Sequence, residues 1–355
     1  MDNSNTQIFC EKLNNLFDTT TKSSMIHECT IHVENIDGDF IWSKGYGGRT
    51  LDSIMNIASI TKLFTTTCII NLIEQGKLSL NDKLGKFFGQ EILGGIHIYK
   101  GKDYSDELTV GNLLFQNTGF PDVFAAENNK LNKRMRHEDF QVSFEEYIRI
   151  AKDNKKKFAP GTSGKAHYSD LNFEMLGKII EQLEASSLHA AFKKYVFRPL
   201  GLQNTYLMET ENDYCADMYY KNNALHLPNL WSSIPACGGC MSTSKEIMIF
   251  LKAFFGGELF DKNIFEKLKK PAMIQYCPPL GQYCGGFVKL NISGIASFYQ
   301  VKGELIGHMG GSGTFAYYYP EKDLYLVGDV NQFAKPGLIF TLPLKIAKLA
   351  YKYLQ

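Results

Sequence analysis

The sequence has no run of about eighteen apolar residues, the length that an apolar helix needs to cross a bilayer. It also lacks an excess of charge of either sign, because 38 Lys and Arg residues balance 37 Asp and Glu residues to a net charge of +1. This balance gives no electrostatic reason to expect nucleic acid or an anionic membrane as a partner. Internal repeats and low-complexity linkers are absent from the 355 residues, of which 44% are hydrophobic. Such a chain is typical of a globular protein with a sizeable core, in one or two domains.

The start of the chain, Met1–Thr6, is polar and lacks the basic and apolar blocks of a signal peptide. We therefore expect a cytoplasmic protein by default, and an extracytoplasmic one if the chain is a processed form.

Cysteine is thinly spread: the eight residues are scattered, without the dense spacing of a secreted disulfide scaffold. Cys237 and Cys240 form a C-x-x-C motif, but no second pair and no nearby histidine completes a zinc site. We expect no metal and interpret these cysteines as small buried residues beside glycines. A thiol redox module built on them is the alternative.

Hydrophobic periodicity predicts strands at both ends of the chain and helices in the middle. The N-terminal part should hold a helix and a hairpin that turns at Asp37-Gly38: Gln7–Phe17, Thr30–Glu34 and Phe40–Ser43. A second set of helices follows the apolar helix that ends near Gly76: Thr109–Phe115, Ser143–Lys152, Leu171–Leu183, Leu188–Phe197 and Lys245–Phe255. The C-terminal strands are expected at Gly286–Leu290, Ala296–Val301, Ile306–His308, Phe315–Tyr319 and Leu324–Val330. A last helix should run from about Leu342 to Leu354, with Pro343 in its first turn.

This layout predicts an α/β (α+β) fold, in which one antiparallel sheet is flanked by the terminal helices and carries an all-helical insertion. We assign residues 1–84 and 191–355 to the sheet region and residues 85–190, which have no good strand pattern, to the helical region. Together they should form one compact catalytic unit with the active site between them.

Ser59 and Lys62 stand at the start of the apolar helix, three residues apart and thus on one helix face. A lysine held partly neutral can take the proton of a serine hydroxyl and make it a nucleophile. The helix start offers unpaired N–H groups that stabilise a developing negative charge. This spacing therefore predicts a serine nucleophile with a lysine base.

A second S-x-x-K motif, Ser242 to Lys245, has a simpler interpretation. Thr243 and Glu246 fit a capping box ahead of an apolar run, so this copy predicts only a helix start.

Two further motifs follow in order along the chain. A Tyr168-Ser169-Asp170 loop precedes a helix, and His308-Met309-Gly310-Gly311 ends a strand. With the serine–lysine pair, this order resembles the penicillin-recognising serine hydrolases, in particular the branch of class C β-lactamases, D-alanyl-D-alanine peptidases and related esterases. The resemblance covers roughly residues 25–335 and predicts the β-lactamase/transpeptidase-like fold.

The resemblance implies a role for each motif. Ser59 would be the acylated nucleophile, and Lys62 and Tyr168 would share its proton. Tyr168 would also protonate the leaving group, its phenol pKa of about 10 being lowered by the Lys62 ammonium. The backbone N–H groups of Ser59 and Gly311 would form the oxyanion hole. Gly310 and Gly311 would let substrate approach the strand edge, and no cofactor is implied.

Asp170 and His308 depart from the β-lactamase pattern, which has asparagine and lysine there. An ionised Asp170 cannot donate to a substrate carbonyl, and near Lys62 it would raise the lysine pKa. Asp170 is a candidate substrate-binding residue, and it fits equally well as the N-cap of the following helix. His308, if it faces the pocket, would gain charge between about pH 7 and 6 and bind a substrate carboxylate.

The sequence therefore predicts a serine hydrolase that forms an acyl-enzyme and cleaves an ester or amide, such as a D-amino-acid peptide or a β-lactam-like substrate. The partner would be a small molecule or a peptide, and the oligomeric state is left open. The alternative is a non-catalytic or slowly deacylating receptor that binds penicillin or peptides.

Overall fold

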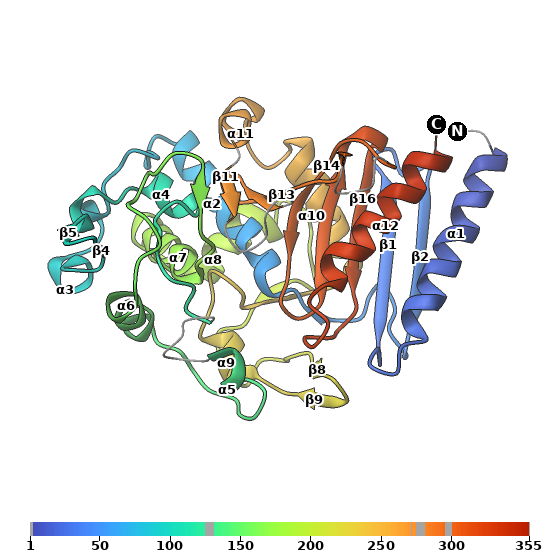
Figure 1. Ribbon diagram of the computed structural model, residues 1–355, viewed down its shortest axis with the longest axis horizontal. Coiled ribbons are helices and arrows are strands. Elements are labelled where there is room, and N and C mark those ends of the chain that lie inside the picture. The colour runs from blue at the N-terminus through green and yellow to red at the C-terminus, as the bar shows by residue number, and fades with distance from the viewer. Residues whose placement is uncertain (1–2, 125–130, 271, 275–280, 295–299, 355) are drawn as a thin grey trace.

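The structure is a computed structural model that describes residues 3–124, 131–270, 272–274, 281–294 and 300–354 (Figure 1). Its centre is a nine-stranded sheet in the order β2-β1-β16-β15-β14-β13-β12-β11-β6. All neighbours pair antiparallel except β11 and β6, which are parallel. The strands are β1 (Cys29–Asn35), β2 (Ile41–Tyr46), β6 (Lys165–Ala166), β11 (Ala272–Ile274), β12 (Gly281–Tyr283), β13 (Val288–Asn291), β14 (Glu304–Met309), β15 (Thr314–Tyr319) and β16 (Leu324–Asp329).

Both predicted hairpins are confirmed. Between β1 and β2, Gly38 takes a φ of 75° that a residue with a Cβ rarely adopts. Between β15 and β16 the short helix Pro320–Lys322 and Asp323, with a φ of 48°, bring Tyr319 opposite Leu324. The strand expected at Ala296–Val301 falls largely on residues 295–299, outside the described ones.

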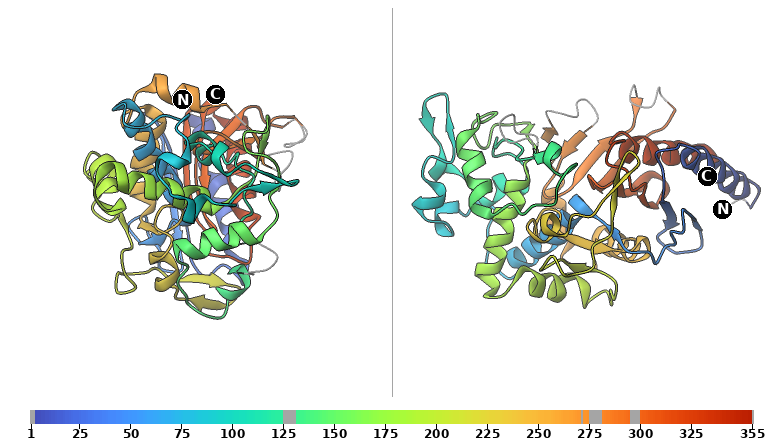
Figure 2. Two further views of the ribbon diagram at one scale, coloured as in Figure 1. Left: turned by 90° about the vertical axis from the view of Figure 1, so that its left-hand side faces the viewer. Right: turned by 90° about the horizontal axis from the view of Figure 1, so that it is seen from below.

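The two terminal helices pack against each other over one face of the sheet, as Figures 1 and 2 show. They are α1 (Asn3–Thr21) and α12 (Leu338–Tyr353), and helix α10 (Ser244–Gly256) packs against β1, β15 and β16 from the other face. The predicted start of the last helix is wrong, because α12 begins four residues earlier and Pro343 lies in its second turn. Burial of Ile339, Leu342 and Ile346 against the sheet holds this turn despite the missing proline N–H.

The part of the chain beyond the sheet is mostly helical (Figure 2). Its helices are α2 (Thr61–Glu74), α3 (Gln90–Leu93), α4 (Val110–Leu114), α5 (Leu131–Arg134), α6 (Phe144–Asp153), α7 (Asp170–Glu184), α8 (Leu188–Phe192) and α9 (Pro228–Ser232), and α11 (Lys262–Leu268) follows α10. Short helical turns lie at Ala58–Ile60 (η1), Leu84–Lys86, Ser105–Glu107 and Lys193–Phe197, the last being a π-helix that continues α8. Residues 85–190 also contain three two-residue strands, β4 (Ile98–Tyr99), β5 (Lys102–Asp103) and β6, which are too short to leave an alternating sequence pattern.

Two small sheets complete the fold. Strands β3 (Met55–Asn56), β10 (Cys240–Ser242) and β7 (Tyr206–Leu207) form one, and β8 (Met218–Tyr220) pairs with β9 (Asn223–Leu225) in the other. The first of these sheets leads directly into η1 and α2, so it fixes where α2 begins.

The predicted fold class is confirmed: a large antiparallel sheet carries the terminal helices, and a largely helical part adjoins it. Within the described residues, no helix combines the length and the apolar character that crossing a membrane requires.

The core predicts a specific stability effect at Phe64. This ring is fully buried in α2 and makes edge contacts with Phe192, Phe197 and Phe250. We expect Phe64→Ala to lower the free energy of unfolding by about 3–5 kcal/mol, because it leaves a cavity among these rings. Ile249→Ala on α10, where the side chain is 41% exposed, is the control and should cost less than about 1 kcal/mol. Thermal unfolding of both variants measures the difference, and equal losses would contradict this account of the core.

Candidate active site

Ser59 lies in the turn η1 (Ala58–Ile60), directly before α2. Ala58 has a φ of 43°, a left-handed conformation that costs energy for a residue with a Cβ. Asn56 stabilises this turn, because its Oδ1 accepts the Ala58 N–H at 2.8 Å. The strained turn presents the partly exposed Ser59 side chain at the start of a helix, where the first N–H groups have no partner within the helix.

Lys62 is fully buried, and its ammonium group contacts three oxygen atoms. Nζ donates to Ser59 Oγ at 3.0 Å and to the Cys237 carbonyl at 2.7 Å, and it lies 2.7 Å from Asp170 Oδ1. Three contacts match the three donors of an ammonium, so the charge is buried with its donors satisfied.

The Cys237 carbonyl is held in place by hydroxyl groups of α2. Thr65 donates to the Ala236 carbonyl at 2.7 Å, and Thr61 accepts the Cys240 N–H at 3.2 Å. Thr61 and Thr65 lie on one face of α2, one turn apart, and their hydroxyl groups hold residues 236–240 against the helix.

Tyr168 precedes α7 in a loop that Gln116 organises. The Gln116 side chain accepts the Ser169 N–H at 2.9 Å and also accepts from the Asn172 amide, and its carbonyl accepts the His167 N–H at 2.8 Å. Gln116 therefore fixes the backbone on both sides of Tyr168.

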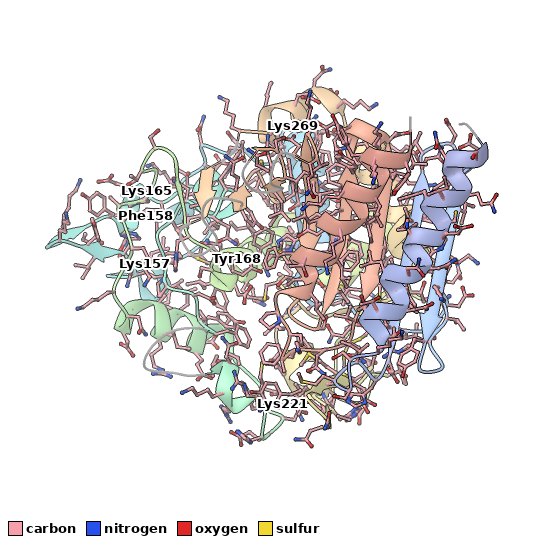
Figure 3. All side chains as sticks on the ribbon, turned by 45° about the vertical axis from the view of Figure 1, so that its right-hand side comes forward. Lys157, Phe158, Lys165, Tyr168, Lys221 and Lys269 are labelled. Carbon is pink, nitrogen blue, oxygen red and sulfur yellow. The ribbon has the colours of Figure 1, made fainter. Side chains whose placement is uncertain are left out.

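This loop directs the Tyr168 ring toward Ser59. Its O–H donates to Ser59 Oγ at 2.8 Å, and its ring centroid lies 4.9 Å from Lys62 Nζ. Figure 3 places Tyr168 between the helical part of the chain and the central sheet. The structure thus brings together the serine, lysine and tyrosine that the sequence predicted, and Ser59 Oγ accepts from both neighbours.

The expected lowering of the Tyr168 pKa is wrong. Burial, and then the negative charge of Asp170, raise the pKa of this phenol well above its ordinary value, and they outweigh the lowering effect of its hydrogen bond with Ser59. The expectation for Lys62 is confirmed. Burial has the largest effect and by itself would lower the pKa of Lys62, but the Asp170 carboxylate, together with Cys237 and Tyr283, raises this pKa above its ordinary value.

Asp170 is the first residue of α7, and it does not cap that helix, because Ser169 occupies the N-cap position. Its buried Oδ1 has no hydrogen bond from another donor among the described residues and faces only the Lys62 ammonium. The N-cap interpretation is therefore wrong, and the carboxylate is paired with Lys62 although it borders the cavity beside Ser59.

Glu174 is a further buried acid that sequence reasoning missed. It lies one turn beyond Asp170 and accepts the N–H groups of Ala236 and Cys237 at 3.1 and 2.9 Å. Burial raises the pKa of Glu174 to about 7, against the lowering effect of these hydrogen bonds and of Lys62. The i, i+4 spacing of Asp170 and Glu174, which places both acids on one helix face, was the signal that could have identified this group.

His308 lies in β14 and lines the same cavity as Ser59, but it is fully buried. Its Nε2 is 3.3 Å from Tyr283 Oη, and its Nδ1 is 2.8 Å from the Met309 carbonyl oxygen. Burial, followed by the positive charge of Lys62, lowers the pKa of His308 to about 3. The expectation that His308 gains charge between pH 7 and 6 is therefore wrong, and this imidazole is neutral at both pH values.

Gly310 and Gly311 follow β14 where the strand meets the Ser59 turn. A Cβ on Gly310 would come within 2.6 Å of the Ile57 carbonyl oxygen and 2.2 Å of Thr314 Oγ1, so only glycine fits this approach. Gly311 borders the cavity, and a Cβ there would meet nothing within 4 Å. Its backbone therefore lies at the cavity wall, on the side of Ser59 that β14 covers.

The second S-x-x-K motif does not assemble a site. Ser242 is buried and exchanges a hydrogen bond with Thr205 at 2.7 Å, whereas Lys245 pairs with Asp52 at the surface. Thr243 caps α10 by accepting the Glu246 N–H at 3.1 Å, as predicted. The Glu246 carboxylate accepts instead from the Gln203 and Asn204 N–H groups, so the capping box is only half formed.

Cys237 and Cys240 are free and buried, and burial raises the pKa of the Cys237 thiol well above its ordinary value. No part of the chain that the structure describes brings three or more His, Cys, Asp or Glu side chains together in a way that could hold a metal ion. The thiol redox alternative gains no support from this geometry, since a protonated, buried thiol is unreactive.

The sequence profile of the Beta-lactamase family matches residues 35–349. The chain belongs to the Beta-lactamase family. The resemblance predicted from the three motifs is thereby confirmed.

Relatives within the Beta-lactamase family include putative D-alanyl-D-alanine carboxypeptidases. The protein from Salmonella enteritidis PT4 is 25% identical over 328 residues, covering 81% of this chain and 73% of the relative. The protein from Salmonella paratyphi A is 30% identical over 175 residues, covering 46% of this chain and 38% of the relative. The aligned part of the second relative is thus well under half of its length.

Solved structures share the fold over nearly the whole chain. D-amino acid amidase from Ochrobactrum anthropi SV3 has a TM-score of 0.73 at 20% identity, covering 96% of this chain and 98% of its own. An octameric penicillin-binding protein homologue from Pyrococcus abyssi has a TM-score of 0.75 at 24% identity, covering 96% and 76%. EstCE1, a hydrolase with promiscuous acyltransferase activity, has a TM-score of 0.77 at 16% identity, covering 98% and 99%. At these identities the likeness shows the fold alone.

The close approach at Gly310 yields a second prediction. In Gly310→Ala the new Cβ must push β14 away from the Ser59 turn, because the Ile57 carbonyl in its path is backbone and cannot rotate away. We expect a loss of roughly 1–3 kcal/mol in the free energy of unfolding, as for other overpacked sites. Gly311→Ala, whose Cβ would enter open space, is the control and should change stability by less than about 0.5 kcal/mol. Denaturant unfolding of both variants compares them, and similar losses would refute the steric argument.

Proposed function

We propose that this chain is a serine hydrolase that becomes acylated at Ser59 and cleaves an ester or an amide. The observation that carries the proposal is the position of Ser59 Oγ, 3.0 Å from Lys62 Nζ and 2.8 Å from Tyr168 Oη, at the edge of a cavity that Gly311 also borders. A serine hydroxyl that accepts hydrogen bonds from a lysine and a tyrosine, with backbone N–H groups beside it, has the components that acyl transfer needs.

The two hydrogen bonds that Ser59 Oγ accepts would stabilise the negative charge that develops on this oxygen as its proton leaves. Both neighbours are protonated at rest, since the pKa values of Lys62 and Tyr168 are raised. The serine proton therefore needs an acceptor beyond them.

Asp170 is the acceptor that the geometry supports. Lys62 Nζ lies between Ser59 Oγ and Asp170 Oδ1, so it can take the proton of Ser59 while it passes one of its own to the carboxylate. The O–H bond of Ser59 is exchanged for an O–H bond on Asp170, and Lys62 stays an ammonium throughout. We propose that Tyr168 then gives its proton to the leaving group and regains the one held by Asp170 by way of Lys62, and that the N–H groups of Ser59 and Gly311 bind the oxyanion.

One observation also favours the alternative of slow deacylation. Hydrolysis of the acyl-enzyme needs a base for the attacking water, and the raised pKa of Tyr168 keeps this phenol protonated at neutral pH. A receptor that acylates and then releases its product slowly would show an initial burst of one product equivalent followed by a slow steady state.

The first experiment tests the nucleophile. A fluorophosphonate probe should add covalently to the wild type and not to Ser59→Ala, because Ser59 has the Lys62 and Tyr168 neighbours described above. Ser242→Ala is the matched control from the other S-x-x-K motif and should be labelled like the wild type. Intact-mass spectrometry measures the adduct, and undiminished labelling of Ser59→Ala would overturn the assignment. A panel of activated esters, D-amino-acid peptides and a chromogenic β-lactam then distinguishes turnover from trapping.

The pH dependence of acylation tests the role of Asp170. In Asp170→Asn the carboxylate that raises the pKa of Lys62 is gone, and burial alone lowers this pKa. In this variant only a neutral Lys62 can accept the serine proton, whereas in the wild type Asp170 accepts it while Lys62 stays an ammonium. We therefore expect kcat/KM of the variant to rise with pH as Lys62 loses its proton, over a range in which kcat/KM of the wild type no longer rises. Stopped-flow acylation with an uncharged activated ester between pH 5 and about 10 measures the profile. A profile that keeps its shape and position would show that Asp170 takes no part in the proton transfer.

A further inference from the structure

The cavity beside Ser59 has an apolar wall. It encloses about 370 Å³, and its lining includes the side chains of Phe124, Met135, Trp231, Ile234, Phe333 and Phe340. These residues come from different parts of the chain: Met135 directly follows α5, Trp231 lies in α9, and Phe340 lies in the first turn of α12. Aromatic side chains on several sides suit an apolar group of the size of a ring or a short alkyl chain.

Among the described residues that line this cavity, the charged side chains leave no cation for a ligand. No lysine or arginine is among the described residues that line it, and Asp170 is the one carboxylate there. Lys62 is fully buried beneath Ser59 and already pairs with Asp170, while His308 is buried and bonded to Tyr283 and to the backbone. A substrate carboxylate in this cavity would face Asp170 without a partner of its own.

Resting on the proposed acylation at Ser59, we propose that the substrate is an ester or amide whose cavity-bound part is apolar and uncharged, and not the carboxylate-bearing end of a peptide. Burying an apolar group in this cavity is favourable in proportion to the area it removes from water. Burying an unpaired carboxylate is strongly unfavourable. A carboxypeptidase substrate ends in a carboxylate, so this chain would differ in specificity from the relatives that carry that name.

A matched set of 4-nitrophenyl esters tests the charge preference. Heptanoate, the monoester of adipate and the methyl ester of that monoester share a similar chain length, and only the second carries a carboxylate. A second series consists of acetate esters and varies the leaving group, comparing an uncharged phenol with a phenol that carries a carboxylate. We expect kcat/KM to be at least about 100-fold higher for the uncharged member in one series or both, because an unpaired carboxylate would have to be desolvated. Differences of less than about threefold in both series would overturn the proposal.

A pair of variants tests whether the cavity itself is responsible. Phe340→Lys places a cation at the cavity wall, whereas Thr341→Lys places the same charge on the next residue, which is exposed and does not line the cavity. We expect Phe340→Lys to reduce the ratio of kcat/KM for uncharged esters to kcat/KM for carboxylated esters by about 10-fold. Thr341→Lys should leave this ratio unchanged. Equal ratios in the two variants would count against the cavity as the binding site.

Mass spectrometry of each ester reaction separates this proposal from the proposed function. Acylation at Ser59 without any preference for uncharged esters would overturn the substrate class alone. Failure of every ester to acylate Ser59, with Ser59→Ala as the reference, would overturn both.

Discussion

The site depends on a buried ammonium group. Lys62 is fully buried, and a charge at such a depth is tolerated only when every donor has a partner. Its three oxygen partners come from the Ser59 turn, from the start of α7 and from residue 237, segments that are far apart in the sequence. Satisfying this one charge therefore requires α2, α7 and the segment before β10 to meet in a single arrangement, and the same arrangement places Tyr168 on Ser59.

The acids around Lys62 determine its protonation and so the chemistry that the site can perform. An asparagine at position 170 would leave burial to lower the lysine pKa, whereas the Asp170 carboxylate raises it. That carboxylate also contributes to the raised pKa of Tyr168. Glu174 holds the segment that carries the Cys237 carbonyl, because its carboxylate accepts the Ala236 and Cys237 N–H groups. In a site with a neutral lysine, the lysine itself would accept the serine proton. With aspartate in place of asparagine at position 170, we propose that Asp170, beyond Lys62, accepts the proton of Ser59 instead.

The other half of the site comes from the edge of the central sheet. Gly310 allows β14 to approach the Ser59 turn, and Ser312 and Thr314 donate to the carbonyls of Asn56 and Ile57 at 2.7 and 3.2 Å. These bonds join the sheet to the turn that presents Ser59. The cavity between them is lined mainly by apolar side chains, which is why His308 is neutral there and why we assign the site an uncharged substrate group.

The sequence alone determined the features that depend on local pattern. Helical spacing predicted that the side chains of Ser59 and Lys62 lie together, as their 3.0 Å contact shows. The order of the three motifs predicted the family that the profile match over residues 35–349 confirms. Capping residues and alternating strands gave the hairpins, the start of α10 and the fold class. Tertiary structure alone decided the protonation of Tyr168 and His308, because a pKa depends on burial and on charges brought in from distant segments. It also decided the partner of Asp170, the part played by Glu174 and the apolar character of the cavity, since each depends on which side chains meet in space, and sequence spacing does not encode that.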